Sequence, residues 1–88
     1  MNFLSEQLRA ARAMLRWSQE DLADKSGVSL GAIKRLEAAP GPLAAQTRII
    51  AKFESALEKA GIELVGPDKA GRVGVILNVN PRNDVSDA

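Results

Sequence analysis

The 88-residue chain contains no cysteine and no histidine. Their absence excludes disulfide bonds, thiol nucleophiles, imidazole bases and the commonest zinc ligands. Aromatic residues are also scarce, with only Phe3, Trp17 and Phe53, so we expect a small core of leucine, isoleucine and alanine. No apolar run approaches the roughly 20 residues of a membrane span, and residues 1–15 lack the apolar stretch of a signal peptide. We therefore expect a cytoplasmic protein without a membrane segment.

An excess of charge of one sign is missing as well, because 12 basic residues face 11 acidic ones and the net charge is +1. Such a balance does not by itself indicate a nucleic-acid partner, and the distribution matters more than the sum. Residues 1–60 hold nine basic and seven acidic side chains, whereas residues 61–88 hold three and four. The basic part is thus the N-terminal part, by a small margin. A single domain of this size has marginal stability, which self-association would increase.

The first part of the chain has the pattern of short capped helices. Apolar residues at helical spacing predict a helix over residues 5–16. Ser18 and Asp21 have the spacing of a capping box, so a second helix should begin at Ser18. Gly27 suits the left-handed residue that ends a helix, which keeps this second helix short.

Two further helices are expected before residue 61. Ser29 can cap a helix over residues 30–38, which a proline-rich segment then ends. Another apolar stripe predicts a fourth helix over residues 45–59, terminated by Gly61. The sequence therefore predicts a helical domain over residues 1–61.

The pattern changes from helical to extended after this domain. Two apolar runs flank a turn rich in glycine and proline, which predicts a β-hairpin over residues 62–77. Residues 78–88 have no apolar period, and we expect a disordered tail there.

Two short helices joined by a glycine-containing turn fit a helix-turn-helix, in which the second helix enters the major groove of DNA. Capping alone would equally fit any small helical bundle. Residue types at fixed offsets across three helices are more specific: Leu8-Arg9-x-x-Arg12-x-x-Leu15, Ser18-Gln19-Glu20-Asp21-Leu22-Ala23, Gly27-Val28-Ser29 and Ile33-x-x-Leu36-Glu37. This motif resembles the helix-turn-helix of the Xre, Cro and phage-repressor family. The resemblance implies a mainly α, lambda-repressor-like domain of about four helices that binds double-stranded operator DNA, usually as a dimer.

The resemblance also assigns roles to residues of the first two helices. Gln19 stands where the family contacts phosphate, a role that a helix N-terminus suits independently. The alternative for Gln19 is a solvated residue in the first turn of the helix. Arg12 and Glu37 stand where similar domains form an internal ion pair. Arg9 and Arg16 then remain as free arginines that can reach DNA.

The third predicted helix departs from the family where base contacts are expected. Leu30 and Gly31 occupy first-turn positions that often carry polar side chains, so Leu30 can offer only an apolar contact to a thymine methyl. Lys34 and Arg35 remain as polar candidates for DNA contacts, with lysine suited to phosphate and arginine to guanine. The alternative is that both belong to an ordinary solvated helix face. Ser29 is a cap first and a possible phosphate contact second.

The predicted hairpin needs a cover, because a lone two-stranded hairpin is marginal in water. Either the domain's own helices or a second copy of the chain could cover its apolar faces. We favour the second copy, since a two-fold pairing of hairpins would build a larger sheet. It would also hold two recognition helices about 34–36 Å apart, as a two-fold operator requires.

Two other functions compete with DNA-binding regulation. An antitoxin-like or adaptor module could keep the fold and bind a protein partner, which would suit Leu30, Gly31 and the low net charge. An enzyme is disfavoured, because no phosphate-cradling glycine motif and no pair of nucleophile and base is found. We therefore expect no catalytic residue, no metal and no cofactor.

Overall fold

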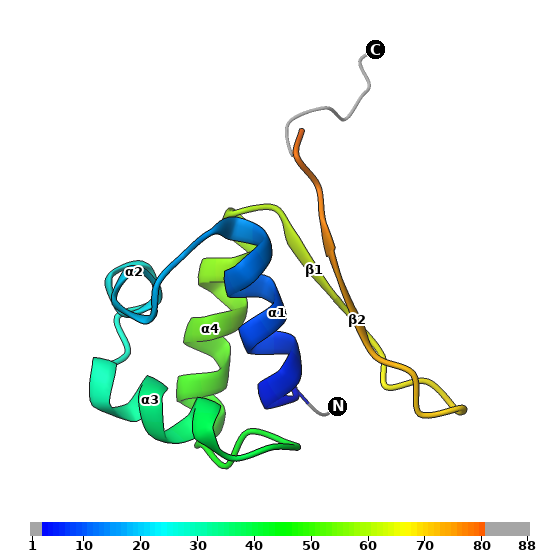
Figure 1. Ribbon diagram of the computed structural model, residues 1–88, viewed down its shortest axis with the longest axis horizontal. Coiled ribbons are helices and arrows are strands. Elements are labelled where there is room, and N and C mark those ends of the chain that lie inside the picture. The colour runs from blue at the N-terminus through cyan, green and yellow to red at the C-terminus, as the bar shows by residue number, and fades with distance from the viewer. Residues whose placement is uncertain (1–2, 81–88) are drawn as a thin grey trace.

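The computed structural model describes residues 3–80. Four helices, α1 (Ser5–Leu15), α2 (Gln19–Ser26), α3 (Leu30–Ala38) and α4 (Thr47–Lys59), are followed by two strands, β1 (Ile62–Val65) and β2 (Gly74–Leu77). In Figure 1 the hairpin lies on the side of α1 that is remote from α2 and α3. The predicted fold class, a helical domain of four helices followed by a β-hairpin, is confirmed. Most of the expected disordered tail, residues 81–88, lies outside the described residues.

Two helix ends differ from the prediction. Helix α1 stops at Leu15, because Arg16 adopts the left-handed conformation with φ 59°. Helix α4 begins at Thr47, two residues later than expected. The segment before α4 is extended beside the start of the chain, where the N–H of Leu43 donates to the carbonyl of Phe3 at 2.9 Å. Gln46, the residue directly before the helix, also has an extended backbone, with φ −64° and ψ 153°, so the helix cannot begin before Thr47.

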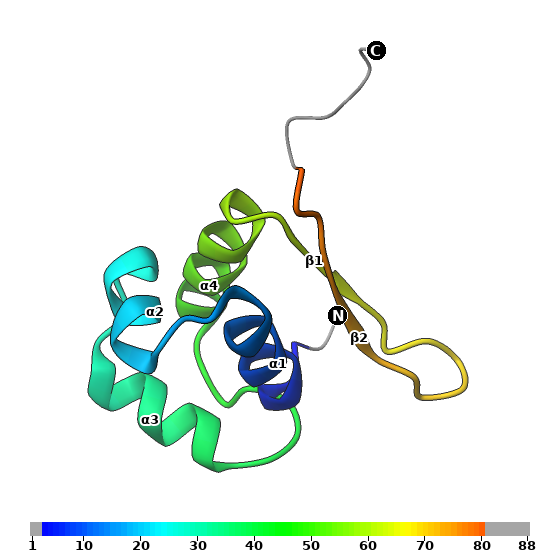
Figure 2. The same cartoon turned by 45° about the horizontal axis from the view of Figure 1, so that its top comes forward.

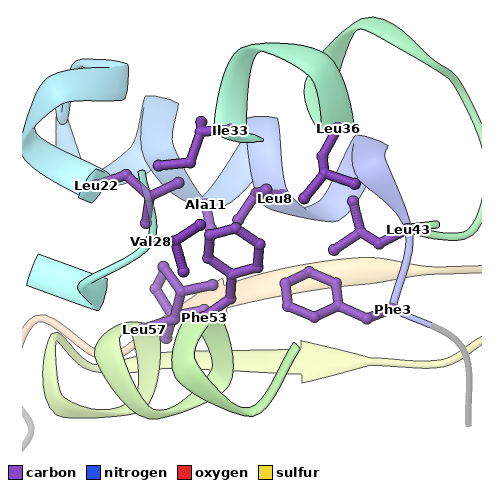
Figure 3. Packing of buried hydrophobic residues seen from close by; sticks show 11 residues of the cluster. Phe3, Leu8, Ala11, Leu22, Val28, Ile33, Leu36, Leu43, Phe53 and Leu57 are labelled. Atoms are coloured by element: carbon purple, nitrogen blue, oxygen red, sulfur yellow. The ribbon is translucent and has the colours of Figure 1, made fainter. Parts of the chain in front are cut away.

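The core lies between the four helices (Figure 3). Each helix contributes fully buried side chains, among them Leu8, Leu22, Ile33 and Phe53. Although aliphatic residues dominate as expected, the two phenylalanines also meet inside the core. The rings of Phe3 and Phe53 pack edge to face, with centroids 6.4 Å apart and an interplanar angle of 79°. Truncating such a buried ring to alanine costs about 3–5 kcal/mol, so the two rings matter to a domain this small.

The hairpin packs on the helical domain. Its strands are antiparallel, with Ile62 opposite Leu77 and Val65 opposite Gly74. One face turns toward α1 and α4, where Ile62 is buried and three neighbours pack against the core, namely Leu64, Val75 and Leu77. The expectation that a second copy covers this face is therefore wrong, because the domain's own helices already do so. Figure 2 shows the hairpin running past these helices, with its turn projecting beyond them.

A buried glutamine joins the hairpin to α1. Gln7 is 2% exposed, and its side-chain nitrogen donates to the carbonyl oxygens of Val65 at 3.0 Å and Gly74 at 3.1 Å. Its side-chain oxygen accepts from the N–H of Leu4 at 3.0 Å. Because Val65 and Gly74 face each other across the sheet, one side chain ties both strands to the helix.

Within the described residues, no helix has the length and hydropathy to cross a bilayer.

Candidate DNA interface

Helices α2 and α3 are joined by a three-residue turn. Gly27 ends α2 in the left-handed conformation, with φ 78°, and its N–H donates to the carbonyl of Ala23. Val28 then turns inward and is 3% exposed. Ser29 begins α3, since its hydroxyl accepts from the N–H of Ala32 at 3.2 Å. The turn thus has the length and glycine that a helix-turn-helix needs to set its second helix across the first.

The N-terminus of α2 is closed by the predicted capping box. The hydroxyl of Ser18 accepts from the N–H of Asp21 at 2.9 Å, and the carboxylate of Asp21 accepts from the N–H of Ser18 at 2.8 Å. Gln19, the first residue of the helix, extends its side chain elsewhere: its amide donates to the carboxylate of Glu37 at 3.0 Å. The sequence did not indicate this contact, which ties the start of α2 to the end of α3. An amide has two donor hydrogens, so a second bond, to phosphate, remains open to Gln19.

An ion pair joins Arg12 of α1 to Glu37 of α3. The guanidinium donates two hydrogen bonds of 2.8 Å to the two carboxylate oxygens, and its third nitrogen donates to the carbonyl of Trp17 at 2.9 Å. The Glu37 side chain is only 3% exposed. Burial on its own would raise the pKa of Glu37, but the hydrogen bonds from Arg12 and Gln19 outweigh burial and lower it. The same pairing raises the pKa of Arg12. Both groups are therefore charged, and the pair joins α1 to α3, while the bond from Gln19 adds α2.

Arg9 is not the free arginine that the sequence indicated. One of its guanidinium nitrogens donates to the hydroxyl of Ser5 at 2.7 Å and to the backbone carbonyl of Glu37 at 2.8 Å. A carbonyl in the last turn of a helix has no partner inside the helix, so this bond closes the C-terminus of α3. The interpretation of Arg9 as free was wrong. Arg16, by contrast, is exposed in the link that leads from α1 to α2.

The outward face of α3 carries most of the remaining candidate residues. Ser29, Gly31, Lys34 and Arg35 are exposed, and Leu30 is partly exposed. The opposite face is buried through Ile33, Leu36 and Glu37. The helix therefore presents one polar face with a single large apolar side chain at its start.

Gly31 has no structural reason to be glycine within the described part of the chain. It lies inside α3, and a Cβ built on it would meet no atom within 4 Å. Glycine in a helix costs roughly 1 kcal/mol relative to alanine, so the domain itself would gain from a larger residue here. The bare backbone at this exposed position instead suits close approach of another molecule.

A further candidate lies at the start of α4. The first turn of this helix contains no acidic residue, its N-cap Gln46 makes no capping bond with its side chain, and Thr47 and Arg48 are exposed. A helix N-terminus favours an anion, and a cation there is unfavourable unless an anion joins it. Sequence reasoning missed Arg48, although a basic residue in the first turn of a predicted helix was the available signal.

This arrangement is that of a DNA-binding helix-turn-helix domain: two short helices joined at Gly27, with the second held by its buried face and open on its other face. A family model described as Helix-turn-helix matches residues 8–60, more than half of the chain. The chain therefore belongs to this helix-turn-helix family of DNA-binding regulators, of the Xre and lambda-repressor kind. The match ends before the hairpin. No curated protein matches the chain.

Proposed function

We propose that the protein is a sequence-specific transcriptional regulator that binds operator DNA as a homodimer, with α3 in the major groove. The observation that carries this proposal is the exposed face of α3, which offers Ser29, Lys34 and Arg35 while the rest of the helix is fixed. We also propose that the protein acts in the cytoplasm.

The fixing of α3 supports a role in recognition. Its carboxylate Glu37 is held by Arg12 and Gln19, and its last turn is held by Arg9. Bonds from two neighbouring helices thus determine where the exposed face points. A binding group whose position is already set loses little freedom on binding, which favours affinity and discrimination.

The side chains of α3 divide into contacts with phosphate and contacts with bases. Arg35 can donate two bonds to guanine in the major groove, whereas Lys34 is suited to a phosphate. Leu30 can contact a thymine methyl, and Gly31 allows the helix backbone to come close. Gln19, Ser29, Arg16 and Arg48 are candidate phosphate contacts, which would orient the domain without reading sequence.

Selection of bound sequences from random DNA duplexes tests the proposal. A two-fold symmetric site with half-sites spaced by one helical turn is expected for a dimer. Replacing Arg35→Ala should weaken binding to the selected site by about 1–3 kcal/mol and relax the preference at one base pair. Lys34→Ala is the matched control, because loss of a phosphate contact should weaken binding to all sequences alike. Unchanged selectivity in Arg35→Ala would remove this residue as a base contact.

An adaptor that binds another protein remains the second candidate, because Leu30 and Gly31 offer no side-chain hydrogen bond at the start of α3. Salt dependence separates the two functions. Release of counterions makes DNA binding fall steeply as salt rises. Absence of binding to duplex DNA even at low salt favours the adaptor, and a steep fall of DNA affinity with added salt favours the regulator.

A further inference from the structure

The outer edge of β2 has no partner strand. The N–H of Asn78 donates to the carbonyl of Gly61 at 2.7 Å, which sets the phase of the β1–β2 ladder. Since peptide groups alternate in direction along an antiparallel strand, those of Val75 and Leu77 point away from β1. Within residues 3–80 the sheet has two strands, so nothing pairs with this edge of β2.

A groove runs beside this edge. It has a volume of about 220 Å³ and lies between α1 and β2, lined by Glu6, Gln7, Ala10, Val73, Gly74 and Val75. No residue of β1 lines it, which places it on the unpaired side of β2. A further strand laid along β2 would find room there for the side chains that it turns toward α1.

The edge also lacks most of the features that normally prevent strands from pairing between molecules. Residues 73–80 contain no charged side chain and no proline, and Ile76 is 51% exposed on the outer face. Natural proteins protect edge strands with lysine, proline, bulges, cover or very short length, and of these we find only the short length, four residues, in β2. An uncharged and apolar edge of this kind is open to pairing with another strand.

We propose that β2 pairs antiparallel with β2 of a second copy of the chain, about a two-fold axis at Ile76, to form a continuous four-stranded sheet. This inference rests on the proposed function as a dimeric DNA-binding protein and names its interface. In this register Val75 of one copy exchanges both hydrogen bonds with Leu77 of the other. The two Ile76 side chains meet on the axis, at the closely spaced, non-hydrogen-bonded position.

The register explains why the partner of the β2 edge is a second copy of the chain. Antiparallel pairing of identical strands uses the unpaired groups of Val75 and Leu77 twice, once on each side of the axis. It covers the exposed Ile76 with its own counterpart, and no like charges meet because the strand is uncharged. The helix-facing side of the hairpin stays on α1 and α4, so the monomer fold does not change.

A disulfide test uses the absence of cysteine from the chain. In the proposed dimer the two Cα atoms at position 76 lie about 4.5 Å apart, within the range of a disulfide. Oxidised Ile76→Cys should therefore run as a covalent dimer on a non-reducing gel. The matched control is Val65→Cys, which lies on the same outer face but on β1 and is 38% exposed. It should remain monomeric on the gel, and equal cross-linking of both variants overturns the register.

A charge test measures the equilibrium in solution. Ile76→Lys places two like charges on the axis of the dimer. Within each chain the new lysine lies opposite Glu63, and this pair of opposite charges stabilises the monomer fold. In sedimentation equilibrium the dimer should weaken by about tenfold or more, whereas the control Val65→Lys should stay dimeric. A monomeric wild-type chain, or an Ile76→Lys variant as dimeric as the wild type, overturns the inference. Should Ile76→Lys fail to fold by circular dichroism, the cross-link at position 76 decides.

Failure of this inference can be told from failure of the proposed function. DNA binding by the wild-type chain, measured at low salt, tests the function directly. Binding without β2 pairing overturns the interface alone, and no binding at any salt concentration overturns the function, whatever the oligomeric state.

Discussion

The side-chain amide of Gln7 donates to the backbone carbonyl of Gly74, which is 67 residues further along the chain, at 3.1 Å. The same nitrogen reaches Val65 on the other strand, and the side-chain oxygen is also bonded. All the hydrogen-bonding groups of this buried amide are therefore used. Position 7 thus determines where the hairpin sits on α1, and with it the direction of the β2 edge.

Gln7→Leu should loosen the hairpin without unfolding the helices. Leucine has a similar volume but no donor, so two carbonyls of the hairpin lose a partner, at a cost of about 1–3 kcal/mol. In native-state hydrogen exchange, the amides of Ile76 and Asn78 should exchange faster. Amides in the middle of α4 serve as the internal control and should change only as global stability does. If the exchange rates of the hairpin amides and of the α4 amides change by the same factor, Gln7 does not anchor the hairpin separately.

The helices could be predicted because their signals are local. The capping box at Ser18 and the glycine at position 27 act within a few residues, and both lie where the sequence placed them. The anchors of Gln7 and Arg9 could not be predicted, because each contacts a backbone carbonyl far along the chain. A carbonyl is present at every residue, so no pattern of side chains marks the one that will be bonded.

Arg12→Ala should lower the melting temperature more than Arg9→Ala. Loss of Arg12 leaves the carboxylate of Glu37, 3% exposed, without its cation, which costs about 3 kcal/mol. Loss of Arg9 removes hydrogen bonds to a hydroxyl and a carbonyl, worth about 1–2 kcal/mol together. For a domain of this size, the melting temperature of Arg12→Ala should therefore lie more than about 10 °C below that of the wild type.

Lys34→Ala is the matched control for these arginine variants, because Lys34 is exposed and no hydrogen bond from it is found in the described residues. Its melting temperature should stay within a few degrees of the wild type. Equal melting of Arg12→Ala and Arg9→Ala would mean that the buried ion pair contributes no more than the helix cap.

Stability should fall at acid pH partly through Glu37. The pKa of this carboxyl is lowered in the folded state from an ordinary value of 4.5, so its charged form stabilises the fold fully above that value. The contribution is lost as the pH falls below 4.5 and through the lowered pKa. Glu6 and Asp68 also have lowered pKa values, through hydrogen bonds from backbone N–H groups, so the variant Glu37→Gln is needed to isolate one group. Its melting temperature should be lower at pH 7 and depend less on pH between 5 and 3. If the melting temperatures of the wild type and of Glu37→Gln fall equally with pH, groups other than Glu37 cause the acid sensitivity.

The hairpin shows a second limit of sequence reasoning. Alternation predicted two strands with apolar faces, and both strands exist. The pattern did not show which surface covers which face, because α1 and α4 offer partners as apolar as a second copy would. Ile62 is buried by its own domain, whereas the outer face and the β2 edge stay open to another molecule in the described part of the chain.

Gly31→Ala should stabilise the protein and weaken its binding to DNA. An added methyl group meets open space and improves helix propensity by roughly 1 kcal/mol, which should raise the melting temperature by about 4–8 °C. In the proposed complex the same methyl group would stand between the backbone of α3 and the bases, and affinity for the selected operator should drop. Ser55→Ala is the matched control, since Ser55 is exposed on α4 and its substitution also favours the helix. It should raise stability and leave affinity unchanged. A Gly31→Ala variant that gains stability and binds the operator as tightly as the wild type would show that no close approach occurs at this position.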